Sequence, residues 1–388
     1  MARVLLVLPS ATYRAPDFLD AAARLGAEVV VGSEHRQALS ESMGDRAVTL
    51  SLSQPQMAAD QIEQLAERTP LDAIVAVDDG GTRAAAEAAR RLGLRGNDPD
   101  AVARARNKAA MREAFAAAGV RQPAFGDDVG FPRVLKPLTL SGSQGVIRAD
   151  TPEEAVLAAD RIRAIVGDPE APLLVEEFVP GDEVAVEALL IGGRLEVLAV
   201  FDKPDPLDGP YFEETIYVTP SRKPKAVLGA IEQAAGDAAR ALGLTEGPVH
   251  AEMRVGQEIT VLELAARSIG GLCSRSLRFG LGVSLEEVIL RHALGMPPGH
   301  LRREELASGV MMLPIPRAGT LREVRGQDAA RAVEGVAGLE ISIAPGKPVV
   351  PLPEGDRYLG FLFAKADTPE QVEGALREAH GRLVVEIA

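Results

Sequence analysis

Hydrophobic positions over the first hundred residues follow two patterns in turn. Short runs that are almost continuously apolar predict buried strands, and Ala- and Leu-rich segments that end at Gly predict helices. The alternating elements are Arg3–Leu8, Pro16–Leu25, Glu28–Val31, Pro55–Arg68, Asp72–Val77 and Thr82–Leu92. Because strand–helix alternation is typical of parallel sheets, we expect an α/β domain over residues 1–100.

The middle of the chain changes to strands joined by tight turns. A helical segment, Pro99–Gly119, precedes this part, and a helix at Leu285–Leu294 ends it near residue 300. Such a pattern predicts an antiparallel, α+β arrangement, and residues 301–388 are again rich in strands. The expected strands of the middle part are F-P-R-V-L-K-P, Leu173–Phe178, Glu183–Leu190 and Leu195–Phe201.

The segment from Val249 to Gly271 has the most informative pattern. V-H-A-E-M-R-V and E-I-T-V-L-E-L predict two strands joined by a two-residue turn at Gly256-Gln257. Glycine at the first central position suits a type II′ hairpin. In that register Val255 lies opposite Glu258.

Side chains alternate along a strand, so this hairpin places His250, Glu252 and Glu263 on one face. Two such carboxylates repel each other unless a cation lies between them, and a hard, oxygen-ligated ion such as Mg²⁺ fits. Arg267 follows four residues after Glu263 and could meet an anion there. A solvated face with ordinary glutamates is the alternative. The core face would consist of Ala251, Met253, Leu262 and Leu264.

Three further segments have groups that suit a nucleoside triphosphate. Lys136 stands among apolar neighbours, and because an unpaired buried ammonium is costly, it should face an anion or a cleft. The loop S-G-S-Q-G at 141–145 offers backbone N–H groups and hydroxyls, as phosphate-binding loops do. In the strand–turn–strand unit E-E-F-V-P-G-D-E at 176–183, the backbone could bind a purine edge and Glu183 the ribose. A strand-edge lysine, an ordinary connector and solvated glutamates are the respective alternatives.

Composition and charge exclude several classes of protein. The 388 residues have a formal net charge of −14 and no long basic run, which argues against a nucleic-acid partner. The G-x-G-x-x-G fingerprint is missing after the first strand, so nicotinamide binding is disfavoured. The single cysteine, Cys273, fits a reducing compartment. No apolar run approaches the ~18 residues of a membrane span. We therefore expect a cytoplasmic protein with no membrane partner.

The order of these motifs resembles that of the ATP-grasp superfamily. Two lysines, a Gly-rich loop, E-E-x-x-x-G-x-E and E…E-x-x-x-R follow one another, and together they are far more specific than any one of them. Within the superfamily the chain is most similar to L-amino acid ligases of the bacilysin-synthase type. That similarity lies in E-L-A-A-R-S-I-G-G from Glu263, and in I-A-P-G-K-P-V-V-P-L-P and Y-L-G-F-L-F-A-K-A-D-T-P-E near the C-terminus.

The resemblance implies an ATP-grasp fold in three parts. A parallel α/β domain would occupy residues 1–100 and an ATP-grasp domain residues 101–300, with a small ATP-clasping subdomain at about 130–190. A small β-rich C-terminal domain would follow at 301–388.

The resemblance also implies a role for each motif residue. Lys108 and Lys136 would hold the α- and β-phosphates of ATP. Glu176 and the backbone at Glu177–Val179 would bind adenine, and Glu183 the ribose. The loop over the γ-phosphate would consist of Ser141, Gly142, Ser143, Gln144 and Gly145.

Metal binding and chemistry are assigned in the same way. Glu252 and Glu263 would hold one or two Mg²⁺ ions, for which Mn²⁺ could substitute. Arg267 would stabilise the acyl phosphate and the tetrahedral intermediate. Ala265 stands where many superfamily members have Asn, so a second ion would depend on Glu263, phosphate and water. Weaker candidates for substrate contacts are Glu214, Arg275, Arg278 and His250.

The implied activity is ATP-dependent carboxylate–amine ligation through an acyl phosphate. Amino acids would be the substrates, and a dipeptide or amino acid conjugate, ADP and phosphate the products. One alternative is another ATP-grasp chemistry, biotin-carboxylase-like or formate-dependent purine ligation, which would use bicarbonate or formate. The other is a non-catalytic ATP-binding protein, which would have no use for Arg267. A homodimer is expected from the family alone.

Overall fold

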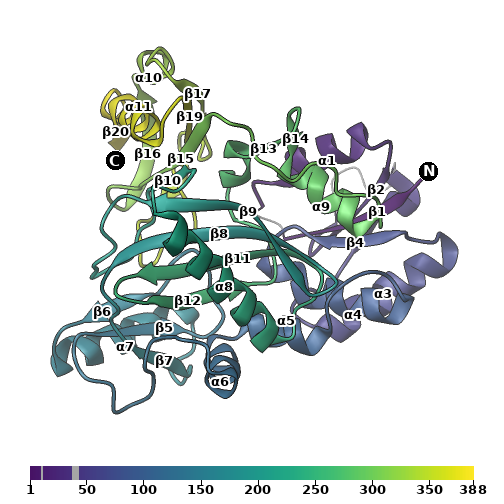
Figure 1. Ribbon diagram of the computed structural model, residues 1–388, viewed down its shortest axis with the longest axis horizontal. Coiled ribbons are helices and arrows are strands. Elements are labelled where there is room, and N and C mark those ends of the chain that lie inside the picture. Colours follow the sequence, from purple (N-terminus) through teal and green to yellow (C-terminus); the bar gives the residue numbers. More distant parts are fainter. Residues whose placement is uncertain (10–11, 37–42) are drawn as a thin grey trace.

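The computed structural model describes residues 1–9, 12–36 and 43–388 (Figure 1). Its N-terminal part is a parallel sheet of four strands in the order β3-β2-β1-β4. Alternate residues of β1 enter two different cores, with Leu6 on the side of α1 and Leu5 on the side of α3 and α4. The expected α/β class is thereby confirmed. The strands are β1 (Arg3–Leu8), β2 (Glu28–Ser33), β3 (Ala47–Thr49) and β4 (Ala73–Ala76), and the helices α1 (Ala15–Arg24), α3 (Pro55–Arg68) and α4 (Thr82–Leu92).

An antiparallel sheet of eight strands forms the centre of the molecule (Figure 1). One face is covered by α8 (Lys225–Leu242), and the other packs toward the N-terminal part. The sequence pattern did not single out α8, whose two glycines, Gly229 and Gly236, weaken a helical signal. In spatial order the strands are β12 (Ile259–Ala265), β11 (Gly247–Val255), β8 (Asp182–Ile191), β9 (Arg194–Lys203), β10 (Ile216–Thr219), β15 (Ala307–Leu313), β19 (Gly360–Ala366) and β17 (Val336–Ile341).

Three of these strands, β15, β17 and β19, come from residues 301–388. The C-terminal part is β-rich, as expected, but it shares the large sheet with the central part instead of forming a sheet wholly of its own. It adds a second, three-stranded sheet and two helices. These are β16 (Gly319–Arg325), β18 (Pro348–Val349), β20 (Val384–Ile387), α10 (Gln327–Arg331) and α11 (Pro369–Gly381).

A small subdomain with its own core lies between the N-terminal part and β8. Its sheet has the order β6-β5-β7, and α7 packs on it through Ala158 and Ile162. The elements are β5 (Arg133–Pro137), β6 (Ile147–Ala149), α7 (Pro152–Val166) and β7 (Leu173–Glu177).

The expected helical segment 99–119 is two helices, α5 (Pro99–Arg106) and α6 (Lys108–Ala118). They are separated at Asn107, whose side chain accepts hydrogen bonds from two backbone N–H groups and caps α6. The break places Lys108 at the first position of α6, beside the cleft described below. Two short strands, β13 (Arg278–Phe279) and β14 (Val283–Ser284), precede α9 (Leu285–Ala293).

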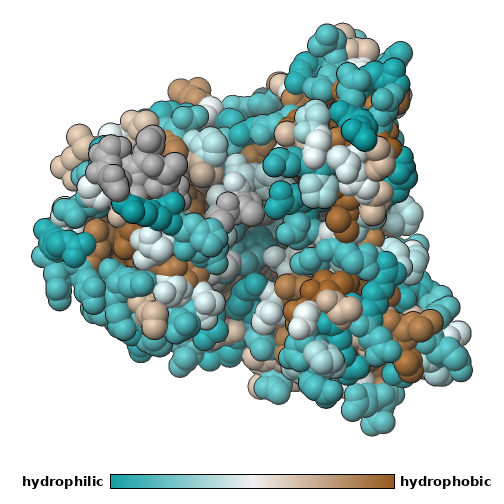
Figure 2. Space-filling view, turned by 180° about the vertical axis from the view of Figure 1, so that it is seen from behind, coloured by the Kyte–Doolittle hydropathy of each residue, from teal (hydrophilic) through white to brown (hydrophobic). Residues whose placement is uncertain are grey.

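Seen from behind, the molecule is hollowed near its middle, between lobes with largely polar surfaces (Figure 2). Within the described residues, no helix combines the length and the apolarity needed to cross a bilayer.

Candidate active site

A cavity of about 410 Å³ lies where the N-terminal, central and C-terminal parts meet. Its volume is within the range of small-ligand sites. Most residues expected to bind nucleotide, metal or substrate line it. These are Lys108, Lys136, Ser141, Gly142, Ser143, Glu176, Glu177, Val179, Glu183, Glu214, His250, Glu252, Glu263 and Arg267.

The observed register of the β11–β12 hairpin differs from the predicted one. Val255 pairs with Ile259, not with Glu258, so the turn contains three residues instead of two. A bulge then inserts Leu262, because Met253 pairs with Val261 while Glu252 pairs with Glu263.

The bulge changes which side chains reach the core. Val261 is buried in the core, whereas Leu262, expected there, lines the cleft. The extra residue also returns Glu263 to the cleft face, directly opposite Glu252. The two carboxylates therefore face the same cavity, as the alternation predicted, but for a different structural reason.

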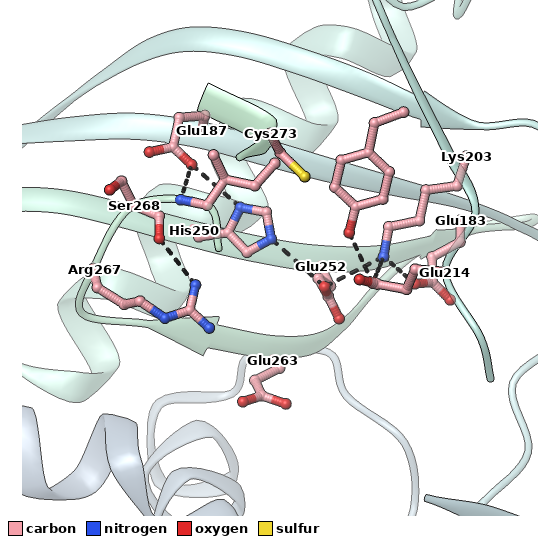
Figure 3. A network of polar contacts seen from close by, with 12 residues as sticks. Glu183, Glu187, Lys203, Glu214, His250, Glu252, Glu263, Arg267, Ser268 and Cys273 are labelled. Atoms are coloured by element: carbon pink, nitrogen blue, oxygen red, sulfur yellow. Dashed lines mark hydrogen bonds and ion pairs between the residues drawn. The ribbon is translucent and has the colours of Figure 1, made fainter. Parts of the chain in front are cut away.

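Lys203 joins three carboxylates at the centre of the cleft (Figure 3). Its Nζ lies 2.7 Å from Glu183, 2.5 Å from Glu214 and 3.2 Å from Glu252. The pKa of Glu214 is raised to about 7, mainly by burial. The negative charge of Glu252 acts in the same direction, and the positive charge of Lys203 only partly opposes them. Glu183 also meets Arg254 at 3.1 Å, so both of its oxygens have cationic partners. Ribose binding by Glu183 stays a prediction.

His250 connects this cluster to a buried carboxylate (Figure 3). Its Nδ1 lies 3.2 Å from Glu187 and its Nε2 3.5 Å from Glu252. Burial disfavours the charged imidazole, but the two carboxylates outweigh it and raise the pKa of His250 to about 9. Glu187 also accepts a hydrogen bond from the backbone N–H of Ile269 at 2.9 Å. The imidazole is therefore in place to orient Glu252.

Glu263 and Arg267 have separate partners around the cleft. Lys108 Nζ lies 3.3 Å from Glu263 and donates to the carbonyl of Leu140 at 2.7 Å. Arg267 Nε donates to Asp79 at 2.8 Å. Asp79 belongs to the D-D-G-G turn after β4, so a residue of the N-terminal part enters the site.

The Glu176 side chain belongs to a buried ion-pair triad. Its carboxylate, 1% exposed, lies 2.5 Å from both Arg112 Nε and Lys136 Nζ. Burial favours the neutral acid, but Lys136 and Arg112 outweigh it and lower the pKa of Glu176. Both oxygens are thus committed to cations. Adenine binding by Glu176 and by the backbone of Glu177–Val179 stays a prediction, and Glu176 does line the cavity.

One part of the Gly-rich loop faces the cavity and the other contacts the C-terminal part. Ser141, Gly142 and Ser143 line the cavity, whereas Gln144 and Gly145 contact the C-terminal part. The N–H of Gly145 donates to Pro353 at 2.9 Å, and the Gln144 amide donates to the carbonyl of Glu354 at 2.9 Å. In this conformation, therefore, Gln144 and Gly145 do not point toward the space expected for phosphate.

Arg275 and Arg278 do not reach the cleft, which contradicts their expected substrate contact. Arg275 pairs with Asp17 and Glu340. Arg278 donates to the carbonyls of Arg275 and Leu277. A short 3₁₀ helix, Cys273–Ser276, turns the chain here, so these guanidinium groups contact neighbouring segments and not the cavity.

Several residues that the structure brings into the site have no clear signal in the sequence. Lys203 and Arg254 neutralise the carboxylates. Tyr217 donates to Glu214 at 2.7 Å, and its ring lies 5.7 Å from that of Phe201 in a tilted arrangement. The cavity is also lined by Tyr13, Ile269, Cys273, Met312 and Tyr358. The available signal for Lys203 was its position just after the apolar run of a predicted strand.

The donor set suits a divalent cation beside nucleotide phosphates. Glu252 and Glu263 are cross-strand neighbours whose side chains are 26% and 31% exposed, and carboxylate oxygens are preferred Mg²⁺ ligands. Each carboxylate already attracts a lysine ammonium, Lys203 or Lys108. These residues fit the ion.

Comparison with known proteins agrees with the fold. The ATP-grasp N-terminal domain matches residues 19–96, the ATP-grasp domain 129–276 and the L-amino acid ligase C-terminal domain 2 311–388. Alanine–anticapsin ligase of Bacillus subtilis is 29% identical over 265 residues, 60% of this chain and 56% of that protein. The chain thus matches less than two thirds of that relative. An uncharacterized protein of Sinorhizobium fredii, y4rH, is 27% identical over 83% of this chain and 73% of its own length.

Solved structures share the fold over the whole chain. An L-amino acid ligase from Bacillus licheniformis has a TM-score of 0.86 at 24% identity, covering 100% of this chain and 99% of that one. A carboxyaminoimidazole ribonucleotide synthase from Aspergillus clavatus, complexed with ATP, has a TM-score of 0.74 at 18% identity, covering 98% and 99%.

The chain belongs to the ATP-grasp superfamily of enzymes, which confirms the family expected from the order of its motifs. Within that superfamily it is similar to the L-amino acid ligases, whose C-terminal domain model it also matches.

Proposed function

We propose that this protein is an ATP-dependent carboxylate–amine ligase that joins amino acids through an acyl phosphate. The observation that supports this most is the meeting of Glu252, Glu263, Lys108 and Arg267 in one cleft of an ATP-grasp fold. The similarity of residues 311–388 to the C-terminal domain of L-amino acid ligases supports amino acids as the substrate class.

In the first half of the proposed reaction, a substrate carboxylate oxygen attacks the γ-phosphorus of ATP. The bond from phosphorus to the β,γ-bridging oxygen breaks, and its electron pair leaves with ADP. Lys108 and Lys136 would align and neutralise the phosphate oxygens, because such transfers depend mainly on positioning and charge. Bound to Glu252 and Glu263, Mg²⁺ would supply Lewis acidity.

In the second half, an amine attacks the acyl carbonyl carbon. A C–N bond forms, the C–O bond to phosphate breaks, and the amine loses a proton as phosphate leaves. Arg267 would supply positive charge where the oxyanion develops. The walls of the cavity would limit the access of water to the acyl phosphate, which otherwise hydrolyses.

The proposal is tested by measuring ADP and phosphate release with ATP, Mg²⁺ and pairs of amino acids. Single amino acids, bicarbonate and formate serve as comparison substrates, and mass spectrometry identifies the product. We expect release only when two amino acids are present, together with an amide product. Release with bicarbonate or formate alone would favour the other ATP-grasp chemistries, and ATP binding without release under any condition would favour a binding protein.

A further inference from the structure

We propose that Asp79, which belongs to the N-terminal part, is a positioning residue that fixes the guanidinium of Arg267 for ligation. This inference rests on the proposed function. It adds to the reaction a residue from outside the ATP-grasp and C-terminal parts, and a dependence of the chemistry on how the N-terminal part docks.

Two contacts determine the orientation of the Arg267 side chain. Nε donates to Asp79 Oδ2 at 2.8 Å, and Nη1 donates to the carbonyl of Ser268 at 2.9 Å. Together they define the plane of the guanidinium. Among the described residues, Nη2 has no protein acceptor, and Arg267 lines the cavity. The remaining N–H groups are therefore available to a ligand anion.

The backbone around Asp79 is held tightly against β1. Thr82 Oγ1 donates to the carbonyl of Asp79 at 2.9 Å, and the N–H of Gly81 donates to Asp78 at 3.2 Å. A Cβ at Gly81 would lie only 2.7 Å from Cγ1 of Val7, so this turn has little room to move. Asp79 is consequently a fixed anchor and not a flexible surface acid.

A second buried arginine supports the other side of the Arg267 segment. Arg14, which is 0% exposed, donates to Ser268 Oγ at 2.8 Å and to the carbonyl of Val77 at 3.2 Å, and it pairs with Glu286 at 3.2 Å. Val77 directly follows β4, two residues before Asp79. The residue that binds Arg267 Nη1 and the residue that binds Arg267 Nε are thus both anchored to the end of β4.

The charge at Asp79 suits this role. Burial disfavours the carboxylate, but Arg267, Arg106 and Lys108 outweigh burial and hold the pKa of Asp79 below its usual value. The side chain is therefore ionised at neutral pH, and its hydrogen bond to the guanidinium is charge-assisted. A purely structural ion pair between the two parts of the chain is the competing explanation.

The test compares Asp79→Asn and Asp79→Ala with the wild type in steady-state kinetics. Because misplacing a catalytic group by about 1 Å can cost on the order of 100-fold, we expect kcat to fall by about 10- to 100-fold. KM for ATP should stay within about 3-fold, since the remaining nucleotide-binding groups are unchanged. Asp60→Asn is the matched control, because Asp60 pairs with Arg91 on the surface of the same N-terminal part.

A double-mutant cycle separates positioning from structural support. If Asp79 acts through Arg267, Asp79→Asn should lower kcat no further in an Arg267→Ala background. The inference would be overturned if Asp79→Asn lowered kcat as much in the Arg267→Ala background as in the wild type. It would also be overturned if kcat were unchanged in Asp79→Asn and in Asp79→Ala. If the wild type makes no amide from any amino acid pair, the proposed function itself fails.

An activity-independent measurement keeps the inference testable in that case. Side-chain ¹⁵N NMR should show a slowly exchanging Nε–H signal that disappears in Arg267→Ala. We expect this signal to be lost or to exchange rapidly in Asp79→Ala, while Tm changes little. Retention of the signal in Asp79→Ala would show that other groups orient Arg267 and would overturn the inference.

Discussion

The ammonium of Lys203 is the positive centre of an otherwise acidic part of the cleft. Glu183, Glu214 and Glu252 contribute carboxylate oxygens that lie within 4.8 Å of one another. Lys203 lies among them and is itself 3% exposed in its side chain. Burial disfavours its charge, but the three carboxylates hold the pKa of Lys203 well above its usual value. Each charge in this cluster is tolerated because of the others.

Replacing Lys203 should therefore destabilise the protein strongly. In Lys203→Met the carboxylates lose their shared partner, and removal of one member of a buried ion pair costs about 3–5 kcal/mol. The free energy of unfolding from denaturant titration measures this loss. Lys223→Met is the control, because Lys223 pairs with the exposed Asp182 and should cost at most about 1 kcal/mol. Equal losses in the two variants would contradict the assignment.

Glu263 is the residue on which proposed metal binding depends most directly. It is partly exposed to the cleft, and its cross-strand partner is Glu252. Glu263→Gln retains the shape of the side chain but removes its charge, so we expect turnover to fall by at least about 100-fold while the protein stays folded. ADP release measures turnover, and Tm shows whether the protein stays folded. Glu258→Gln, an exposed position in the turn of the same hairpin, is the control. Wild-type kcat in Glu263→Gln would reject the metal assignment.

Among the elements, the Glu176 triad connects three pieces of secondary structure. Glu176 lies on β7, Lys136 on the neighbouring β5 and Arg112 on α6. Arg112 also contacts the carbonyl of Leu262, the inserted residue of the β12 bulge. The Glu176 carboxylate thereby links the small subdomain to α6, and Arg112 extends this connection to the hairpin of the site.

The triad predicts a specific pH dependence of stability. The pKa of Glu176 is lower in the folded protein than in the unfolded chain, so its contribution is present above the unfolded pKa of about 4.5. That contribution should disappear as pH falls through the folded pKa. The difference in unfolding free energy between wild type and Glu176→Gln should thus be largest near pH 7, about 3–5 kcal/mol, and smaller below pH ~4. Glu153→Gln, at an exposed position of α7, should show no such trend. A pH-independent difference would argue against an ionised Glu176.

On the scale of the whole molecule, the small subdomain is connected to the C-terminal part. Arg161 on α7 forms a bidentate ion pair with Glu354, with N–O distances of 2.5 and 3.0 Å. This pair lies next to the Gly145–Pro353 hydrogen bond. Asp356 and Tyr358, from the same C-terminal loop, line the cavity. The position of the Gly-rich loop is therefore connected to the wall of the substrate cleft.

This connection should be weak enough to open during turnover. The side chains of Arg161 and Glu354 are 42% and 40% exposed, and such pairs contribute about 0.2–1 kcal/mol. In Glu354→Gln we expect hydrogen exchange of the Ser141–Val146 amides to speed up by about two- to five-fold. Glu378→Gln removes a surface pair on α11 and should leave that exchange unchanged. Unaltered exchange in Glu354→Gln would show that the pair does not hold the loop.

Elements whose buried residues recur with a regular local period were predictable from the sequence alone. The bounds of β1, α3 and α4 agree with the pattern, and the order of the lysine, glycine and glutamate motifs identified the superfamily, because both are readable within short windows. The register of the β11–β12 hairpin was not readable in this way. A three-residue turn and a one-residue bulge both depend on packing against β8 and α8.

Which side chains meet in the site depends on how distant segments dock in the folded chain. Arg267 and Asp79 are 188 positions apart, and Lys203 finds its carboxylates on three different segments. Arg275 and Arg278 lie close to Arg267 in sequence, yet a single turn of 3₁₀ helix directs them away from the cleft. The alternation and spacing of hydrophobic residues indicate which side of a helix or strand is buried. They do not report what lies across from it, because those partners come from distant segments whose docking depends on the whole fold.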